Sequence, residues 1–395
     1  MTSKNVFHIS AALALLGAMA ATPAQADDYS GAAPAPVVLA APVMSGPLKA
    51  DPNPWSFNAG QFGRIYAGGI AGVMGLSQDN SKAGDKNSHL DIANAQAFIQ
   101  STGAPWGFYA QAGVYSLPAL GTSYLRAAKE TDDTYGLLPV GYISYAASNS
   151  LSVKAGKLPT LLGDENTFTF QNMNIARGLL WGQENAINRG VEGDYSAGPM
   201  AFALSWNDGF YSNHYSWLTG RATYNVGAND VIAVDAGGNL VRTDVNRFET
   251  PVAQNNSKSV DLMYTHTSGQ WTLNPYIQYT YAGTNASAGI DHTGSSFGAA
   301  FLANYKFDAL LNIAGRAEYI STTGNAAEKA PNLLYGQGSK AWSLTLTPTY
   351  QVGPVFARAE ASYVHASSIT AGDAFGSSGK DSAQARMIFE TGLLF

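Results

Sequence analysis

The sequence predicts an all-β protein, an antiparallel transmembrane β-barrel of about 16 strands. The last segment, residues 383–395, alternates with a period of two, so one face is apolar while the other carries Arg386 and Glu390. Short and long connections also alternate along the chain. Only 13% of the 395 residues are charged although 46% are hydrophobic, against a usual charged share of about 25%. An apolar exterior around a polar interior is what a transmembrane barrel requires.

Residues 1–26 have the features of a secretory signal peptide. Lys4 precedes an apolar run at 9–21, and the small residues Ala24 and Ala26 flank a cleavage position before Asp27. The run is too short for a membrane-spanning helix, and no later segment approaches about 18 apolar residues. The alternative interpretation is a buried N-terminal helix. An exported chain without helical spans can still cross a membrane as a closed barrel.

Residues 27–54 are rich in alanine and proline and follow neither the helical nor the strand period. This composition predicts an extended, mostly disordered leader in the periplasm. The barrel domain is then expected over residues 55–395. The chain contains no cysteine, which excludes disulfides, zinc–thiolate clusters and thiol chemistry.

From residue 62 onward, alternating segments of roughly 9 to 13 residues are separated by turn residues. Sixteen is an even number, as single-chain bacterial barrels require. The second, fourth and sixth segments alternate poorly, so 14 or 18 strands also fit the pattern. The predicted strands are 62–76, 90–100, 106–116, 137–147, 150–157, 186–195, 199–207, 216–226, 230–239, 257–267, 270–281, 295–306, 309–320, 339–351, 354–365 and 383–395.

The connections between these strands alternate in length without exception. In outer-membrane barrels the short turns lie on the periplasmic side and the longer loops lie outside the cell. Both chain ends are therefore expected at the periplasmic end. A secreted β-sandwich or propeller, the second interpretation, does not predict this alternation. The short connections are 101–105, 148–149, 196–198, 227–229, 268–269, 307–308 and 352–353, and the long ones are 77–89, 117–136, 158–185, 208–215, 240–256, 282–294, 321–338 and 366–382.

Strand parity also places charged residues on the inner face, because a charge facing lipid costs roughly 2–4 kcal/mol at the midplane. The sequence Arg-Ala-Glu occurs at 316–318 and again at 358–360, and puts opposite charges two residues apart on one face. They are interpreted either as ion pairs that brace the wall or as a basic ladder along the solute path. The predicted lumen-wall residues are Arg64, Lys154, Arg316, Glu318, Arg358, Glu360, Arg386 and Glu390, with Arg221, Asp235 and Asp261 on the same face.

The third outer loop, residues 158–185, is the longest connection and contains large apolar residues such as Trp181. Such residues are costly to leave in water, and long loops are often functional. We therefore expect the loop to fold inward and narrow the lumen. Asp164 and Glu165, with Arg177, are the hypothesised pore constriction, where opposed charges create a transverse field. The alternative is a loop that caps the barrel or contacts a neighbouring subunit.

The segment from Val153 to Glu165 (VKAGKLPTLLGDE), followed by Gln171-Asn172 and the run Arg177 to Gly182 (RGLLWG), resembles the OmpL-like β-barrel porin family of Gram-negative outer membranes. The stretch Phe108–Leu117 is similar as well. The resemblance covers most of residues 55–395 and is most specific over about 150–210. It implies an outer-membrane pore for small hydrophilic solutes. The terminal Phe395 likewise resembles the signal that the barrel-assembly machinery reads.

Three functional classes remain open at this stage. A diffusion porin for small hydrophilic solutes and ions is favoured. A substrate-selective channel, for example for sugars, would use aromatic tracks. An outer-membrane hydrolase is the third, but the six histidines are scattered and no nucleophile or metal motif is present. The candidate aromatic residues are Phe168, Phe170, Trp181, Tyr211, Tyr215 and Trp217.

We therefore expect no enzyme, cofactor or metal site. The expected partners are outer-membrane lipid, the barrel-assembly machinery and the solutes, and general porins suggest a homotrimer. The formal net charge of −6 argues against a nucleic-acid partner. The expected location is the bacterial outer membrane, reached through the cleaved signal peptide.

Overall fold

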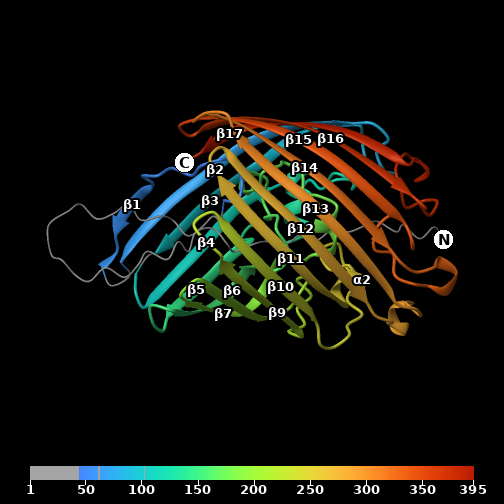
Figure 1. Cartoon of the computed structure of the whole chain (residues 1–395), viewed down its shortest axis with the longest axis horizontal. Helices are drawn as coiled ribbons and strands as arrows, with labels where there is room; N and C mark the ends of the chain where they lie inside the picture. Colours follow the sequence, from blue (N-terminus) through green and yellow to red (C-terminus); the bar gives the residue numbers. More distant parts are fainter. Residues whose placement is uncertain (1–43, 61–62, 102) are drawn as a thin grey trace.

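The computed structural model describes residues 44–60, 63–101 and 103–395, and these form one antiparallel barrel (Figure 1). Each strand from β2 to β16 pairs with the next along the chain, and β17 pairs with β2 to close the ring. Closure in this order confirms the predicted 16-strand barrel. The strands are β2 (Arg64–Gln78), β3 (Ser88–Ser101), β4 (Trp106–Tyr115), β5 (Val140–Ala146), β6 (Leu151–Pro159), β7 (Ile187–Ala197), β8 (Met200–Asn207), β9 (Trp217–Asn225), β10 (Asp230–Asn239), β11 (Ser257–Ser268), β12 (Trp271–Ala282), β13 (Gly294–Lys306), β14 (Leu311–Thr322), β15 (Lys340–Val352), β16 (Val355–Ser367) and β17 (Ala383–Leu394).

Two kinds of element were not predicted. A short strand, β1 (Trp55–Asn58), pairs with the first residues of β2. The loops contain short helices, none of which is long and apolar enough to cross a membrane within the described residues. The helices are α1 (Ala127–Asp133), α2 (Val252–Asn255), η2 (Thr169–Gln171), η3 (Leu180–Gln183), η4 (Ala286–Ala288) and η5 (Ala326–Glu328).

The predicted strand boundaries are close to the observed ones, and the largest difference is in β5. Residues 137–139 were predicted to begin this strand, but β5 starts at Val140. The carbonyl of Leu137 instead accepts the N–H of Gly113 from the neighbouring strand β4. Gly136, just before it, has a φ of 72°, which is a turn conformation that glycine adopts without strain.

The two ends of the barrel differ as the connection lengths predict. Tight connections such as 198–199, 269–270 and 353–354 lie at the end that also holds β1 and the C-terminus, which we call the short-turn end (Figure 1). The long connections, among them 116–139 and 368–382, lie at the opposite, long-loop end.

Every strand presents one face outward and the other inward. In β15, for example, Leu344 is 55% exposed whereas Thr345 is 6% exposed. Large apolar residues cover the outside of the barrel, and the inner face is polar or small except where apolar side chains such as Leu302, Phe356 and Ile388 pack against the loops. This is the arrangement that a lipid exterior requires.

The N-terminal segment is described from residue 44 onward. The predicted signal peptide and residues 27–43 lie outside the described residues. Residues 44–54, which were predicted to belong to a disordered leader, contact the barrel. Leu48 is buried, and the backbone N–H groups of Ser45 and Gly46 bind the carbonyl of Gln171. Burial of an apolar side chain and paired backbone groups order this part of the segment.

Candidate functional site

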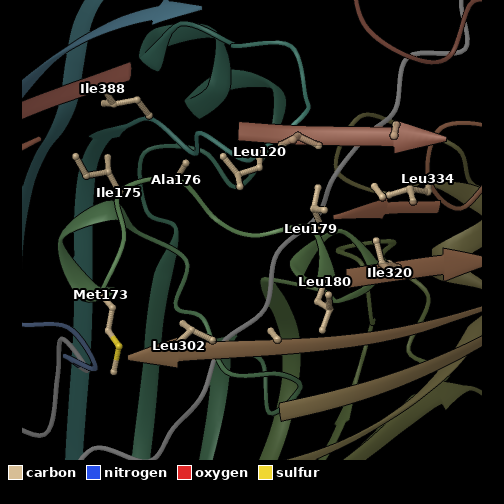
Figure 2. Packing of buried hydrophobic residues seen from close by; sticks show 14 of the residues in the cluster. Leu120, Met173, Ile175, Ala176, Leu179, Leu180, Leu302, Ile320, Leu334 and Ile388 are labelled. Atoms are coloured by element: carbon tan, nitrogen blue, oxygen red, sulfur yellow. The ribbon is translucent and has the colours of Figure 1, made fainter. Parts of the chain in front are cut away.

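The connection between β6 and β7, residues 160–186, is called loop L3 here. Every residue in it is buried except Asp164, which is partly exposed. Figure 2 shows Ile175 and Leu180 of L3 packed with Ile388 of β17 and Leu302 of β13, and these belong to one buried apolar cluster. L3 therefore packs against inward-facing side chains of the barrel wall.

The Arg-Ala-Glu sequence at 358–360 lies on β16 and contacts L3. Arg358 donates to three backbone carbonyls of residues 169–173, each at 2.9 Å. Glu360 accepts the backbone N–H groups of residues 175–176, at 2.5 Å from the nitrogen of Ile175 and 3.2 Å from that of Ala176. One strand thus satisfies carbonyl and N–H groups of an irregular stretch that has no ladder of its own.

The Arg-Ala-Glu sequence at 316–318, on β14, satisfies backbone groups in the next part of L3. Arg316 donates to the Ala176 carbonyl at 2.9 Å and forms an ion pair with Glu165 at 2.5 Å. Glu318 accepts the N–H groups of residues 179–180 at 2.8 and 3.3 Å. Arg316, Glu318, Arg358 and Glu360 together are called the clamp. Hydrogen bonds to ionised groups are about twice as strong as neutral ones, so the clamp holds L3 firmly.

β17 extends this contact region. Glu390 accepts the hydroxyl of Thr169 at 2.5 Å and lies 3.4 Å from Arg358. Arg386 donates at 2.8 and 2.7 Å to two carbonyls within residues 119–122, in the loop between β4 and β5. The inward charges of β14, β16 and β17 therefore bind loop backbone.

The opposite side of L3 meets a different set of charges. Arg221, Asp235, Asp261 and Gln278 lie directly opposite one another across β9, β10, β11 and β12. Arg221 pairs with Asp235 at 3.2 Å, and Gln278 donates to Glu184 of L3 at 2.5 Å. We call Asp235, Asp261 and Glu184 the acidic wall.

Carboxylates outnumber arginines at the acidic wall. Asp164 lies on this side as well, because Asn274 of β12 donates to it at 2.7 Å. Arg221 is the arginine of this row, and it also donates to the Gly163 carbonyl at 2.8 Å. Among the described residues, no group of three or more Asp, Glu, His or Cys is arranged to hold a metal ion. Asp235, Asp261 and Glu184 are each at most 1% exposed, whereas Asp164 beside them is partly exposed.

The three residues of the hypothesised constriction do not share one open gap. Glu165 touches Arg316, and its other oxygen accepts the Gly178 N–H at 2.7 Å. Asp164 faces β12. Arg177 is fully buried, with its guanidinium 5.7 Å from the ring of Trp181. Its role and that of the two carboxylates in permeation stay predictions.

Two of the predicted lumen-wall residues lie apart from L3. Arg64 is exposed at the first position of β2 and donates to the hydroxyl of Ser56 at 2.9 Å. Lys154 pairs with Glu192 and Asp194 of β7, at 2.9 Å each. The remaining predicted wall residues, Arg316, Glu318, Arg358, Glu360, Arg386 and Glu390, all belong to the contacts with loops described above.

The candidate aromatic track is not an exposed surface. Phe168, Phe170, Trp181 and Trp217 are each at most 1% exposed. Tyr211 packs on the guanidinium of Arg189 at 3.9 Å. Tyr215 is exposed, but it lies in the connection between β8 and β9, at the long-loop end.

Strand parity places the clamp residues on the inner face but carries no information about their partners. The repeated Arg-Ala-Glu was the available signal, since each copy contacts a separate stretch of L3. Glu184 and Gln278 were not singled out. Glu184 lies in an irregular loop that has no periodicity to show its orientation.

Comparison with known proteins supplies the class of barrel. The family described as "Putative beta-barrel porin-2, OmpL-like" matches residues 68–395. No curated protein sequence matches the chain.

Several solved structures share the fold. A trimer form of OmpT, an outer-membrane protein of Vibrio cholerae, is 12% identical, with a TM-score of 0.57 over 84% of this chain and 99% of that one. OmpF of Salmonella typhi in complex with daunomycin is 13% identical, with a TM-score of 0.57 over 86% and 100%. At such identities the likeness shows the fold alone.

Proposed function

Because the chain belongs to the OmpL-like β-barrel porin family, and is therefore a porin of the bacterial outer membrane, we propose that it admits small hydrophilic solutes by passive diffusion. A barrel of 16 strands is wide enough to enclose a water-filled channel. The single observation that carries the proposal in detail is the docking of L3 on the inner wall. A folded-in loop leaves a narrow path, which passes small solutes and excludes large ones.

In this proposal the path runs past Asp164, which is partly exposed beside the buried acidic wall. The clamp residues are engaged with L3, so their charges are neutralised by close partners. Asp235, Asp261, Glu184 and Asp164 have one arginine among them. A passage bordered by excess carboxylates concentrates cations and repels anions. We therefore propose a pore of low conductance that prefers cations.

The proposal also covers assembly and export. A solved neighbour, OmpT of Vibrio cholerae, has a trimer form, and we propose a homotrimer for this chain. In this proposal the signal peptide is removed after residue 26, the short-turn end faces the periplasm, and the barrel-assembly machinery reads Phe395. Porin family membership supports a channel without enzymatic activity.

Flux into liposomes tests this function directly. Vesicles containing the purified protein should swell in small sugars and amino acids at rates that fall steeply with solute size. A protein-free vesicle preparation is the control. Swelling no faster than in the control, with every solute in several lipid mixtures, would contradict a diffusion channel.

A further inference from the structure

Residues 44–49 contact L3 at its centre. The N–H groups of Ser45 and Gly46 both donate to the carbonyl of Gln171, at 2.8 and 2.9 Å. The hydroxyl of Ser45 donates to the same carbonyl at 3.1 Å and accepts the amide of Asn166 at 2.5 Å. The helix η2, which ends at Gln171, is thus bound from the N-terminal segment as well as by Arg358 of the clamp.

The approach at Gly46 is close enough to require glycine. A Cβ at this position would lie 2.1 Å from the carbonyl oxygen of Asn172, and 2.9 Å from the backbone nitrogen of Met173. These neighbours are backbone atoms that Arg358 holds in place. A larger residue would therefore separate the segment from L3.

The same segment is fixed to the barrel wall three residues later. The N–H of Lys49 donates to the side-chain oxygen of Gln351 at 2.8 Å, and the amide of Gln351 donates back to the Lys49 carbonyl at 2.8 Å. Gln351 lies next to the last residue of β15, at the short-turn end. Leu48, between the two anchors, is 2% exposed and belongs to the cluster that contains Phe168 and Phe170 of L3.

We propose that residues 44–49 form a strap that ties L3 to the short-turn end of the wall and so sets the width of the pore. The clamp holds L3 from β14 and β16, whereas the strap holds η2 from the rim of the barrel. L3 cannot move away from the wall at this level while both are in place. Release of the strap removes residues 44–49 from the space beside L3, where Leu48 packs with inward-facing side chains of the wall, and so widens the path. This inference rests on the proposed function, because pore width has meaning only for a channel.

Two variants release the strap from opposite partners. Gly46→Val forces the segment away from Asn172, and Gln351→Ala removes both hydrogen bonds to Lys49. The matched control is Gly227→Val in the turn between β9 and β10, where a Cβ meets nothing within 4 Å. Both strap variants should raise single-channel conductance about twofold or more and should admit larger sugars in the swelling assay. The control should conduct like the unmodified protein.

Hydrogen exchange of residues 165–175 measures the same release without any channel activity. Exchange there should speed up at least about tenfold in both strap variants and stay unchanged in the control. Should the unmodified protein not conduct, the proposed function fails while this readout still decides whether the strap holds L3. If Gly46→Val does not assemble, Gln351→Ala, whose change is confined to a side chain at the rim, decides alone. Unmodified conductance and unmodified exchange in an assembled strap variant would overturn the proposal.

Discussion

The two walls that border L3 use inward charges in different ways. On β14 and β16, each arginine and glutamate of the clamp binds a backbone group or an ion partner, and Glu165 and Glu390 are further ion partners of the two arginines. On β9 to β12 the carboxylates exceed the arginine, and Asp235 and Asp261 lie directly opposite each other. The first wall fixes the position of the loop. The second holds carboxylates in excess, and Asp164 beside them is partly exposed.

The largest effect on assembly should come from the closure of the barrel, where β17 pairs with β2. Phe395 exchanges backbone hydrogen bonds with Gly69, at 2.6 and 2.9 Å. Deleting Phe395 should abolish most insertion into the outer membrane while export to the periplasm continues, because the strand end and the assembly signal are lost together. Fractionation of cells and heat-modifiable migration on gels measure this. Insertion at the level of the unmodified protein would show that assembly does not require Phe395.

Glu360→Ala tests the clamp itself. It leaves two buried N–H groups of L3 without acceptors, and it leaves the positive charge of Arg358 with one fewer carboxylate nearby. Unpaired buried donors cost about 1–3 kcal/mol each, and breaking a buried ion network about 3–5 kcal/mol. Urea unfolding in lipid vesicles should show a destabilisation of roughly 3–5 kcal/mol, together with a higher conductance. The control is Glu328→Ala in the exposed helix η5, which should change neither. A stable variant of unmodified conductance would show that the clamp does not hold L3.

Asp261→Asn tests the acidic wall. Unlike Glu360→Ala, it should change ion selectivity without lowering stability. Removing one of two opposed like charges relieves repulsion, so stability should stay equal or rise by about 0.2–1 kcal/mol. The permeability ratio of cations to anions should fall because the field weakens. Reversal potentials in a salt gradient measure it. Asp308→Asn, in an exposed short turn, is the control. A ratio that is lower in both variants alike would assign selectivity to overall charge instead of this wall.

The smallest effect concerns the outer side of L3, where α1 carries the buried Glu130. Burial raises the pKa of this carboxyl from 4.5 to about 8, Asp133 adds to the shift, and Arg177 opposes it. A raised pKa in the folded state means that the packing of α1 is strongest below pH 4.5 and weakens as the pH rises to 8. The protection factors of the α1 amides, which are exchange rates corrected for the pH dependence of intrinsic exchange, should therefore be lower at pH 8 than at pH 5.

Glu130→Gln should abolish this pH dependence, because the neutral amide imitates the protonated acid. The same exchange measurement at the two pH values checks it. A pH dependence that persists in the variant would assign the effect to another group.

Much of the barrel could be predicted because a strand has a strict period of two and lipid excludes charge. That rule placed Arg316, Glu318, Arg358 and Glu360 on the inner face. Their partners could not be predicted, since the path of L3 follows no period and its backbone groups meet whichever wall residues its turns bring near.

The N-terminal segment illustrates the same limit. Its alanine and proline content predicted disorder up to residue 54. The contacts of Ser45, Gly46 and Lys49 depend on Gln171 and Gln351, which lie far away in sequence. Local composition carries no information about such tertiary partners.

In the pore that we propose, L3 is held by the clamp and leaves a narrow path beside the acidic wall. Single-channel recording in planar bilayers with a salt gradient tests it most directly. The recordings should show small, stable, ohmic steps whose reversal potential lies toward the equilibrium potential of the cation and shifts toward zero in Asp261→Asn. Large steps without ion preference, an anion-selective reversal potential, or no conductance in several lipids would contradict it.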